Sequence, residues 1–419
     1  MRWLIVEEAL RDRKGHWFEA IATFRRGFCA RGDEVVVLAD SAVDPDIREL
    51  LDAVPVLPTS IWHLTGDGSG HLTRYSRVFT HAWRIWQTVG SYLDRDSEFE
   101  AIFVPSVGLH HLLAWAWLIK RKLRDRPVRV LLFFLILPIR WNPDLEEMER
   151  DGSPTSRLFF KLLKWLEPEI RSGRVILGAE VEQIRAALAT LSGVPATLFP
   201  QIVIPFTTGG GSHLPATNEI SMGCYGPSRA EKGTDVLQDA IAIYCRRFPA
   251  GRARFLVHWT EDFLTENGRT AARLPELMRD SRVQYLTDFF AHGEYEAQLR
   301  RTQVMLLPYR LSGYRLRGSR VVMEAMVNGM PVITTRGTSL ALLVKAHGAG
   351  LFCDDGDPES LALAIREMEE RYEELRQVAQ AKMPAATREF SIDTFRRTFL
   401  QSSPAVRIGL PCAVASPIG

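Results

Sequence analysis

A short loop in the second half of the chain combines glycine with two cations. The stretch ISMGCYGPSRAEKGTDVL holds a strand-like run that ends at Tyr225, followed by Gly226, Arg229, Lys232 and the start of a helical pattern. Arginine can bind phosphate oxygens in a bidentate manner and lysine acts as a point charge, so the loop suits a diphosphate group. The alternative is a solvated loop in which Glu231 neutralises a neighbouring cation. The spacing alone leaves both interpretations open.

A second polar segment, LLPYRLSGYRLRGSRVVMEAM, leads from a strand-like run into a helix. The N–H groups at a helix start attract anions, and nearby arginines strengthen such a site. Ser319 is a favourable N-cap residue, and the Glu324 carboxylate can accept both hydroxyls of a ribose. In the alternative, Arg320 and Glu324 form an i,i+4 pair worth about a few tenths of a kcal/mol on a solvated stripe with Asn328. The candidates for anion contacts are Arg315, Arg317, Gly318, Ser319 and Arg320.

The first half offers polar residues at three comparable positions. Gly15 and His16 lie where a loop meets a helix, and a glycine there lets an anionic group approach the backbone. His110 and His111 follow the strand-like run AIFVPS, and Arg140 follows LLFFLILP. The alternatives are a turn glycine, a surface histidine and a histidine packed against a nearby tryptophan. Arg140 is a candidate for binding a second substrate.

Short apolar runs alternate with helical patterns along the whole chain, and this alternation predicts the elements that position these residues. Near-continuous apolar runs are typical of parallel strands buried on both faces. The pattern therefore predicts two doubly wound α/β domains, 1–205 and 206–390, with ligands at the carboxyl ends of the strands. We expect strands at 3–6, 34–38, 101–105, 129–135, 175–178, 196–199, 220–225, 254–259, 283–286, 304–307, 331–335 and 350–353.

The composition excludes several classes of protein. The 419 residues are 46% hydrophobic and 24% charged, which is typical of a globular protein and not of a disordered one. Lys and Arg number 52 against 50 Asp and Glu, so we expect no nucleic-acid partner. Five cysteines without CxxC spacing indicate a reducing compartment and no zinc site. We expect a cytoplasmic protein without a signal sequence, and a disordered tail over 403–419.

Three motifs in order resemble the retaining GT-B glycosyltransferases of family four. Glu324-Ala-Met-Val-Asn-Gly-Met-Pro-Val-Ile is similar to the family's C-terminal signature, and YGPSRAEKG is similar to its donor-phosphate loop. The stretch GAGLFCDDGDPESLALAI resembles the strand and helix that follow in the family. The resemblance covers about 220–380 and is weak in the first half. It implies a GT-B fold, in which two Rossmann-like domains face a cleft, and a helix over 391–402 that crosses back to the first domain.

The resemblance also implies roles for individual residues. Glu324 would bind the donor ribose, and Arg229 and Lys232 would hold the diphosphate and stabilise the leaving nucleoside diphosphate. A histidine at 110 or 111 would face the transferred sugar. The implied reaction moves a sugar from a UDP-, GDP- or dTDP-sugar to an acceptor hydroxyl, with retention and without a metal ion or other cofactor. The implied setting is polysaccharide or glycoconjugate biosynthesis.

The sequence departs from the family pattern at two positions. Leu316 stands where the family usually has a glutamate that contacts the sugar ring, and Arg229 lies closer to Lys232 than is common. The first departure keeps open the alternative of a catalytically degenerate GT-B-like binding protein. A nucleotide-sugar epimerase, another kind of GT-B enzyme, is a second alternative. A saccharide or lipid-linked acceptor is expected. The Trp-rich and basic segment 112–126 suggests peripheral contact with the inner face of a membrane, although a core helix with a solvated basic end is the favoured interpretation.

Overall fold

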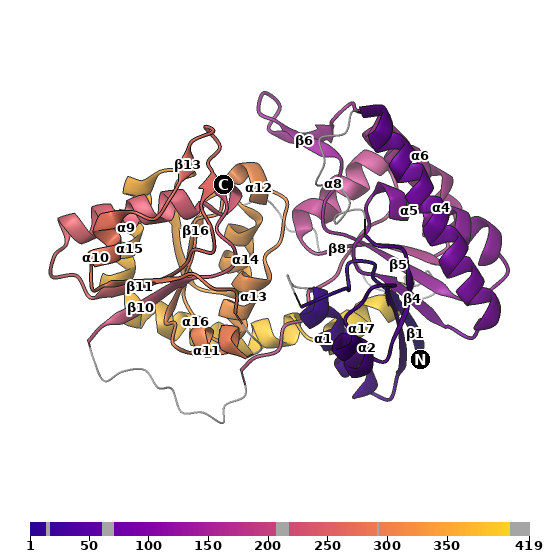
Figure 1. The fold of residues 1–419 in the computed structure, drawn as a ribbon, viewed down its shortest axis with the longest axis horizontal. Coiled ribbons are helices and arrows are strands. Elements are labelled where there is room, and N and C mark those ends of the chain that lie inside the picture. The colour runs from indigo at the N-terminus through magenta and orange to yellow at the C-terminus, as the bar shows by residue number, and fades with distance from the viewer. Residues whose placement is uncertain (14–16, 61–70, 207–217, 291–292, 403–419) are drawn as a thin grey trace, which may run out of the picture. The chain divides into compact units, whose positions relative to one another are not determined.

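The chain folds into two α/β units, each built around its own parallel sheet (Figure 1). The computed structural model describes residues 1–13, 17–60, 71–206, 218–290 and 293–402. Unit 1 comprises Met1–Ile202 and Ile392–Gly419, and unit 2 comprises Val203–Ser391. The predicted site residues Gly15 and His16 and the predicted disordered tail 403–419 lie outside the described residues.

The sheet of unit 1 has seven parallel strands in the order β3-β2-β1-β4-β5-β8-β9. Strand β1 pairs with β2 on one side and with β4 on the other, so the strand order reverses between β1 and β4. In doubly wound sheets this reversal is where ligands bind. The strands are β1 (Arg2–Val6), β2 (Glu34–Asp40), β3 (Ala53–Leu57), β4 (Ala101–Val104), β5 (Arg129–Phe134), β8 (Val175–Ala179) and β9 (Thr197–Leu198).

Helices cover the sheet of unit 1, and the last one comes from the far end of the chain. Helix α17 (Ile392–Gln401) buries Phe395 and Phe399 in the same core as Trp3. The Arg396 guanidinium donates to the Asp33 carboxylate over 2.9 Å. Because Asp33 directly precedes β2, this bond fixes α17 to the start of that strand. The other helices are α1 (Trp17–Cys29), α2 (Pro45–Leu51), α4 (His71–Arg95), α5 (Leu109–Trp117) with a π-helical turn (Leu118–Lys122), α6 (Pro154–Trp165), α7 (Glu167–Arg171) and α8 (Glu182–Ser192).

The sheet of unit 2 has six parallel strands in the order β14-β11-β10-β15-β16-β17, and its order reverses between β10 and β15. The strands are β10 (Ile220–Cys224), β11 (Ala253–His258), β14 (Val283–Leu286), β15 (Val304–Leu307), β16 (Val332–Thr335) and β17 (Gly350–Cys353). The helices are α9 (Thr234–Arg247), α10 (Pro275–Arg279), α11 (Glu294–Arg300), α12 (Leu311–Tyr314), α13 (Arg320–Val327), α14 (Ser339–His347), α15 (Pro358–Glu370) and α16 (Tyr372–Glu389).

The predicted doubly wound architecture is confirmed, and all twelve expected strands are present within a residue or two. Strand β3 was not predicted, because Pro55 interrupts its apolar run; proline is tolerated there since β3 lies at the sheet edge. Two small hairpins were not predicted either: β6 (Ile139–Asn142) with β7 (Glu147–Arg150), and β12 (Phe263–Leu264) with β13 (Thr270–Ala271).

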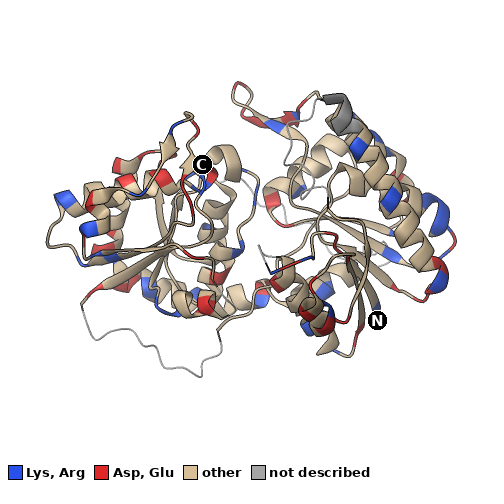
Figure 2. Ribbon diagram, viewed as in Figure 1, with Lys and Arg blue, Asp and Glu red and all other residues tan. Residues whose placement is uncertain are grey.

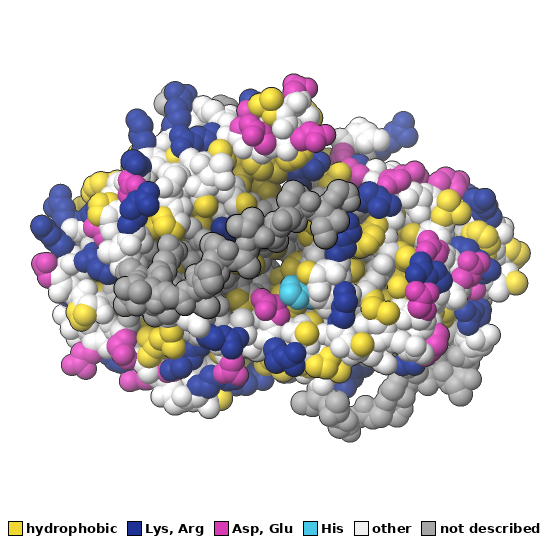
Figure 3. Space-filling view, turned by 180° about the vertical axis from the view of Figure 1, so that it is seen from behind, with side chains coloured by type: hydrophobic (Ala, Val, Ile, Leu, Met, Phe, Trp, Pro, Cys, Tyr) yellow, Lys and Arg dark blue, Asp and Glu magenta, His cyan; other side chains and the backbone are white. Residues whose placement is uncertain are grey.

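Charge is distributed evenly over the molecule. Figure 2 shows acidic and basic residues on the elements of both units. In the space-filling view of Figure 3, Lys and Arg side chains alternate with acidic and apolar ones over the coloured part of that face. None of the helices in the described parts of the chain combines the length and the apolar character that crossing a bilayer requires.

Candidate functional site

The reversal point of the unit 2 sheet lies beside the loop that follows β10. Gly226 in this loop has a φ of +99°, a backbone conformation that residues with a side chain rarely adopt. A Cβ at this position would overlap the Nζ atom of Lys232. The glycine therefore makes room for the lysine ammonium directly above the end of β10.

Lys232 is a half-buried cation without a counter-ion. Burial lowers the pKa of its ammonium to about 8, and repulsion from Arg229 and Arg317 contributes to the shift. Among the described residues no carboxylate lies within ion-pair distance of Lys232, and the Tyr309 ring centroid is 5.9 Å from Nζ. Desolvating a charge without a partner is costly. An anion that binds here would recover that cost, so the position is suited to a phosphate.

Arg229 lies in a different environment from Lys232. Its side chain is 57% exposed, and its guanidinium lies 3.6 Å from the Glu231 carboxylate. The alternative interpretation, in which Glu231 neutralises a neighbouring cation, therefore holds for Arg229 and not for Lys232. Arg229 is the N-cap residue of a single 3₁₀ turn, Ala230–Lys232, and Lys232 is the last residue of this turn. The two cations therefore lie at opposite ends of the turn. A role of Arg229 at the diphosphate stays a prediction.

Gly233 joins the two loops that flank the reversal point. Its φ is +63°, and a Cβ there would overlap the carbonyl oxygen of Pro308, which follows β15. The Arg310 N–H donates to the Glu231 carbonyl over 2.9 Å and fixes the same two loops to each other. Lys232 is thus held between the ends of β10 and β15 by rigid backbone contacts.

His258, at the end of β11, supports the Gly226 loop. Its Nδ1 accepts from the Gly226 N–H over 3.1 Å, so its Nε2 carries the hydrogen and donates to the Asp288 carbonyl over 3.0 Å. Burial lowers the pKa of the imidazole, which keeps His258 neutral beside Lys232. The sequence analysis missed this residue. A histidine at the end of a strand predicted to neighbour β10 is the signal that could have found it.

Glu324 is buried on α13 and makes two hydrogen bonds. Its carboxylate accepts from Arg320 Nε over 2.9 Å and from the Tyr295 hydroxyl over 2.6 Å. The expected Arg320–Glu324 pair therefore forms, but the expectation of a solvated stripe is wrong, because the Glu324 side chain is only 10% exposed. A carboxylate has about four acceptor positions. About two remain for other donors, and the ribose assignment of Glu324 stays a prediction.

The start of α13 lies close to Lys232. Ser319 occupies the N-cap position, but its side chain does not cap the helix and hydrogen-bonds with the buried Tyr309 instead. The Arg317 guanidinium lies over the Tyr314 ring at 5.2 Å and is near enough to Lys232 to lower its pKa. The half-buried Arg315 ends helix α12, and Gly318 precedes the N-cap. The structure therefore brings Arg317 and the first N–H groups of α13 to the same sheet edge as Lys232.

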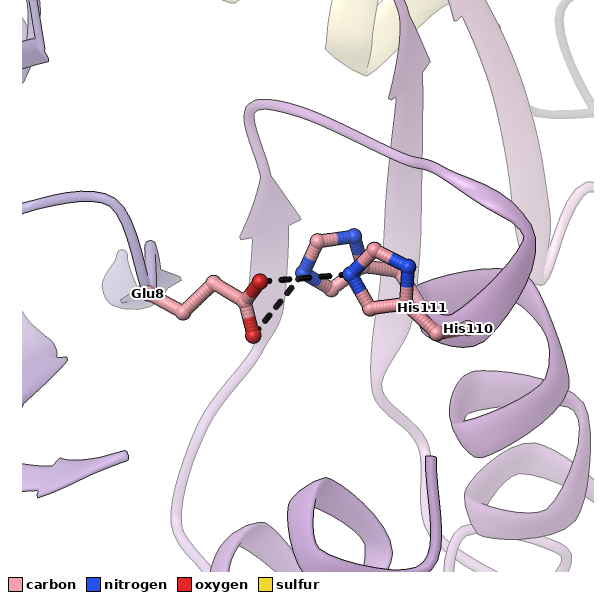
Figure 4. Close-up of side chains that lie close together, drawn as sticks. All are labelled: Glu8, His110 and His111. Atoms are coloured by element: carbon pink, nitrogen blue, oxygen red, sulfur yellow. Dashed lines mark hydrogen bonds and ion pairs between the residues drawn. The ribbon is translucent and has the colours of Figure 1, made fainter. Parts of the chain in front are cut away.

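The reversal point of the unit 1 sheet carries the two predicted histidines. His110 and His111 lie in the first turn of α5, just after β4, and both are buried. Figure 4 shows both rings facing the carboxylate of Glu8, which follows β1. Glu8 lies 3.2 Å from His110 Nε2 and 3.4 Å from His111 Nε2. The structure thus places the histidines against a carboxylate and not against a tryptophan, and their contact with a sugar stays a prediction.

Two further residues complete this histidine–carboxylate cluster. His81 of α4 lies 2.6 Å from Glu8, and the Ser60 hydroxyl donates to Glu8 over 3.0 Å. Burial lowers the pKa of His110 to about 4, so this imidazole is neutral. Although burial alone would raise the pKa of Glu8, the surrounding imidazoles lower it well below its usual range. The sequence analysis missed Glu8 and His81, and the acidic pair directly after β1 was the available signal.

The neighbouring acid behaves in the opposite way. Burial raises the pKa of Glu7 to about 7, although its carboxylate accepts from the Ala9 N–H and from the Ser106 hydroxyl.

Arg140 lies on the β6–β7 hairpin of unit 1. It is 65% exposed and paired with Glu149 at 2.6 Å, so its charge is neutralised. A role of Arg140 in binding an acceptor stays a prediction.

Comparisons with known proteins agree with this architecture. Residues 220–371 match the family described as glycosyl transferases group 1. A glycosyltransferase from Rickettsia africae has a similar structure, with a TM-score of 0.63, 10% identity and coverage of 98% of this chain and 99% of that chain. HepE of Anabaena, in complex with UDP and glucose, gives a TM-score of 0.59, 13% identity and coverage of 96% and 99%.

A third similar structure is the sucrose-phosphate synthase of Thermosynechococcus elongatus, with a TM-score of 0.61, 16% identity and coverage of 97% of this chain and 98% of that chain. A comparison with curated proteins finds no match. These structural matches over nearly the whole chain show that the protein has the GT-B fold. The match to glycosyl transferases group 1 covers residues 220–371, which lie within unit 2.

Proposed function

We propose that the protein transfers a sugar from a nucleotide-diphospho-sugar to an acceptor hydroxyl with retention of configuration. The observation that carries the proposal is Lys232, a cation placed over Gly226 at the reversal point of the unit 2 sheet. The similarity to HepE, whose structure contains UDP and glucose, makes UDP-sugars the first donors to test. GDP- and dTDP-sugars are the other candidates.

Charge stabilisation is the chemistry that this edge of the sheet can supply. In the transfer, the C1–O bond to the diphosphate breaks and the acceptor oxygen bonds to C1. The acceptor proton leaves with the departing nucleoside diphosphate. Lys232, with the N–H groups at the start of α13, would stabilise the negative charge that develops on the diphosphate. Glu324 would accept hydrogen bonds from the ribose hydroxyls. Because protein groups supply this positive charge, we propose that turnover needs no divalent ion.

The acceptor is proposed to be a saccharide or a lipid-linked hydroxyl in polysaccharide or glycoconjugate biosynthesis. Helix α5 is a buried core helix, and the exposed part of segment 112–126 is its basic end, where Arg121 and Arg124 are exposed. The adjacent α4 exposes Phe79 and Trp83, which are 46% and 48% exposed. Aromatic side chains of this kind favour a membrane interface. Co-sedimentation with anionic vesicles, compared between wild type and Trp83→Ser, tests this contact.

The test of the function is incubation of the full chain with UDP-, GDP- and dTDP-sugars and a panel of saccharide acceptors, with and without EDTA. The proposal expects a nucleoside diphosphate and a glycosylated acceptor with the anomeric configuration of the donor. A product whose sugar is altered but still attached to the nucleotide would identify an epimerase. Donor binding without any turnover would identify a degenerate binding protein, as Leu316 suggests. Either result would overturn the proposal.

A further inference from the structure

The histidine–carboxylate cluster of unit 1 has a composition and geometry that the proposed function does not use. One ligand atom each from Glu8, His110 and His111 lies within 4.8 Å of the other two. All three side chains are buried, with at most 7% of any of them exposed. Imidazole nitrogens and a carboxylate oxygen that converge in this way are the donor set that zinc-type ions prefer.

The surroundings of Glu8 also suit a metal ion. Its side chain is 2% exposed, and within the described residues the groups at ion-pair distance from it are three imidazoles and no lysine or arginine. Carboxylates buried in proteins are normally paired with a cation or bound to a metal. The Nε2 atoms of His110 and His111 lie close to this carboxylate, so a divalent ion placed between them would be within reach of nitrogen and oxygen donors together.

The framework that holds the three residues is rigid. Glu8 follows β1, and the histidines begin α5 just after β4, which pairs with β1 in the register Ile5–Phe103. Two groups hold the carboxylate from outside: His81 at 2.6 Å and the Ser60 hydroxyl at 3.0 Å. Outer hydrogen bonds of this kind orient metal ligands in established sites.

We propose that Glu8, His110 and His111 bind one divalent ion of the zinc type, with His81 and Ser60 orienting the carboxylate. Three protein ligands leave a fourth position of a tetrahedral site open to water. The site does not depend on the proposed glycosyl transfer. The cysteine spacing could not reveal it, because its ligands are a glutamate and two histidines that are about a hundred positions apart in the sequence.

One contact must change when the metal enters. The Gly108 N–H donates to His111 Nδ1 over 3.2 Å, so in the structure Nε2 carries the hydrogen and donates to Glu8. Coordination through Nε2 requires the opposite tautomer, with the hydrogen on Nδ1. Metal binding therefore opens the Gly108 contact and moves the hydrogen of His111 from Nε2 to Nδ1, which gives the proposal a spectroscopic signature.

The first test titrates the metal-stripped full chain with Co²⁺ and then with Zn²⁺. We expect one Co²⁺ per chain, with the strong visible absorption of a four-coordinate site, displaced by Zn²⁺. Glu8→Gln and His110→Gln should weaken binding by about a hundredfold, and His81→Gln by about tenfold, as reported for outer-shell partners. His347→Gln, in unit 2, is the control and should bind as wild type does. Wild type that binds no stoichiometric metal would overturn the proposal, as would Glu8→Gln that binds as tightly as wild type.

A second measurement needs no variant and so does not depend on the folding of one. Long-range ¹H–¹⁵N correlation spectra of histidine-labelled protein report which ring nitrogen carries hydrogen. We expect the two imidazoles to shift on addition of one equivalent of Zn²⁺, both with a change from the Nε2–H to the Nδ1–H tautomer, because both direct Nε2 at the Glu8 carboxylate. Spectra that stay unchanged at saturating Zn²⁺ would show that the cluster is held by hydrogen bonds alone, and the proposal would fail.

Discussion

The two units place opposite chemistry at the same point of the same architecture. In unit 2 the reversal between β10 and β15 carries Lys232, a cation with no acidic partner among the described residues. In unit 1 the reversal between β1 and β4 carries Glu8, an anion surrounded by imidazoles. The sheet determines where the polar side chains gather, and the residue types in the loops determine which ligand charge is accepted. We therefore expect unit 2 to bind the anionic diphosphate and unit 1 to bind cations.

The largest expected effect is that of removing the unit 2 cation. Lys232→Met keeps an unbranched side chain that is one atom shorter, but loses the charge that would stabilise the leaving diphosphate. We expect kcat/KM for transfer to fall by about 10²–10³, in line with the loss of one preorganised stabilising group. Arg229→Met removes a cation that is exposed and paired with Glu231, and should cost less than about tenfold. Equal losses of kcat/KM in the two variants would show that Lys232 and Arg229 contribute alike to the transfer.

Gly226→Ala should have the next largest effect. The new Cβ overlaps the position of Lys232 Nζ and occupies a backbone conformation with a φ of +99°. We expect UDP affinity to fall by about tenfold or more as the lysine is displaced. Gly32→Ala is the matched control, because its φ is +75° but nothing lies within 4 Å of the added Cβ. Isothermal titration of both variants decides whether space or backbone strain is responsible, and an unchanged affinity in Gly226→Ala would contradict the account.

Glu324→Gln should have a moderate effect on nucleotide binding. The substitution removes the charge that binds Arg320 and weakens the acceptor proposed for the ribose. Hydrogen bonds to charged groups contribute about 1.5–3 kcal/mol, so a loss of roughly tenfold in UDP affinity is expected. Glu369→Gln is the control, because Glu369 is buried beside Tyr244 and Arg252 at the other end of the strands. UDP that binds equally well to Glu324→Gln and wild type would leave Glu324 with a structural role only.

The smallest effect should come from unit 1. Glu8→Gln removes the negative charge of the histidine–carboxylate cluster, which holds no part of the proposed diphosphate site. We expect UDP affinity to change by less than about twofold, while the affinity for Co²⁺ falls strongly. A large loss of UDP affinity in a folded Glu8→Gln protein would show that the two reversal points do not act separately.

Much of the fold could be predicted from the sequence, because parallel strands buried on both faces are near-continuous apolar runs. Val130–Phe134 and Val304–Leu307 are examples, and both are fully buried. β3 escaped the pattern because Pro55 interrupts it. The sequence from 358 to 377 has the apolar spacing of one helix, but the chain forms two helices there, α15 and α16, which meet at Arg371. Apolar periodicity continues across that break, so the pattern alone could not reveal it.

The site could be predicted only where its chemistry is local in sequence. Lys232 stands in a loop with two glycines, and that short segment is enough to make an anion site one of its two interpretations. Glu8 and His81 are 73 positions apart, and Gly226 and His258 are 32 apart. Their significance depends on which strands are neighbours. The alternative of a solvated stripe through Glu324 fails for the same reason, because Tyr295 comes from a different helix and hydrogen-bonds to the carboxylate.

The most direct test of the account is the proton balance of UDP binding. In the free protein the pKa of Lys232 is about 8, lowered by burial, so the amine is largely neutral above that value. A bound diphosphate favours the ammonium and raises the pKa of Lys232. At a pH between the pKa in the free protein and the pKa in the complex, UDP binding therefore takes up a proton. The affinity for UDP falls as the pH rises above about 8. Titration calorimetry at pH 8.5 in buffers of different ionisation enthalpy should show uptake of a substantial fraction of a proton in wild type and in Arg229→Met, and none in Lys232→Met. The same proton balance in wild type and Lys232→Met would contradict the assignment of Lys232 to the diphosphate.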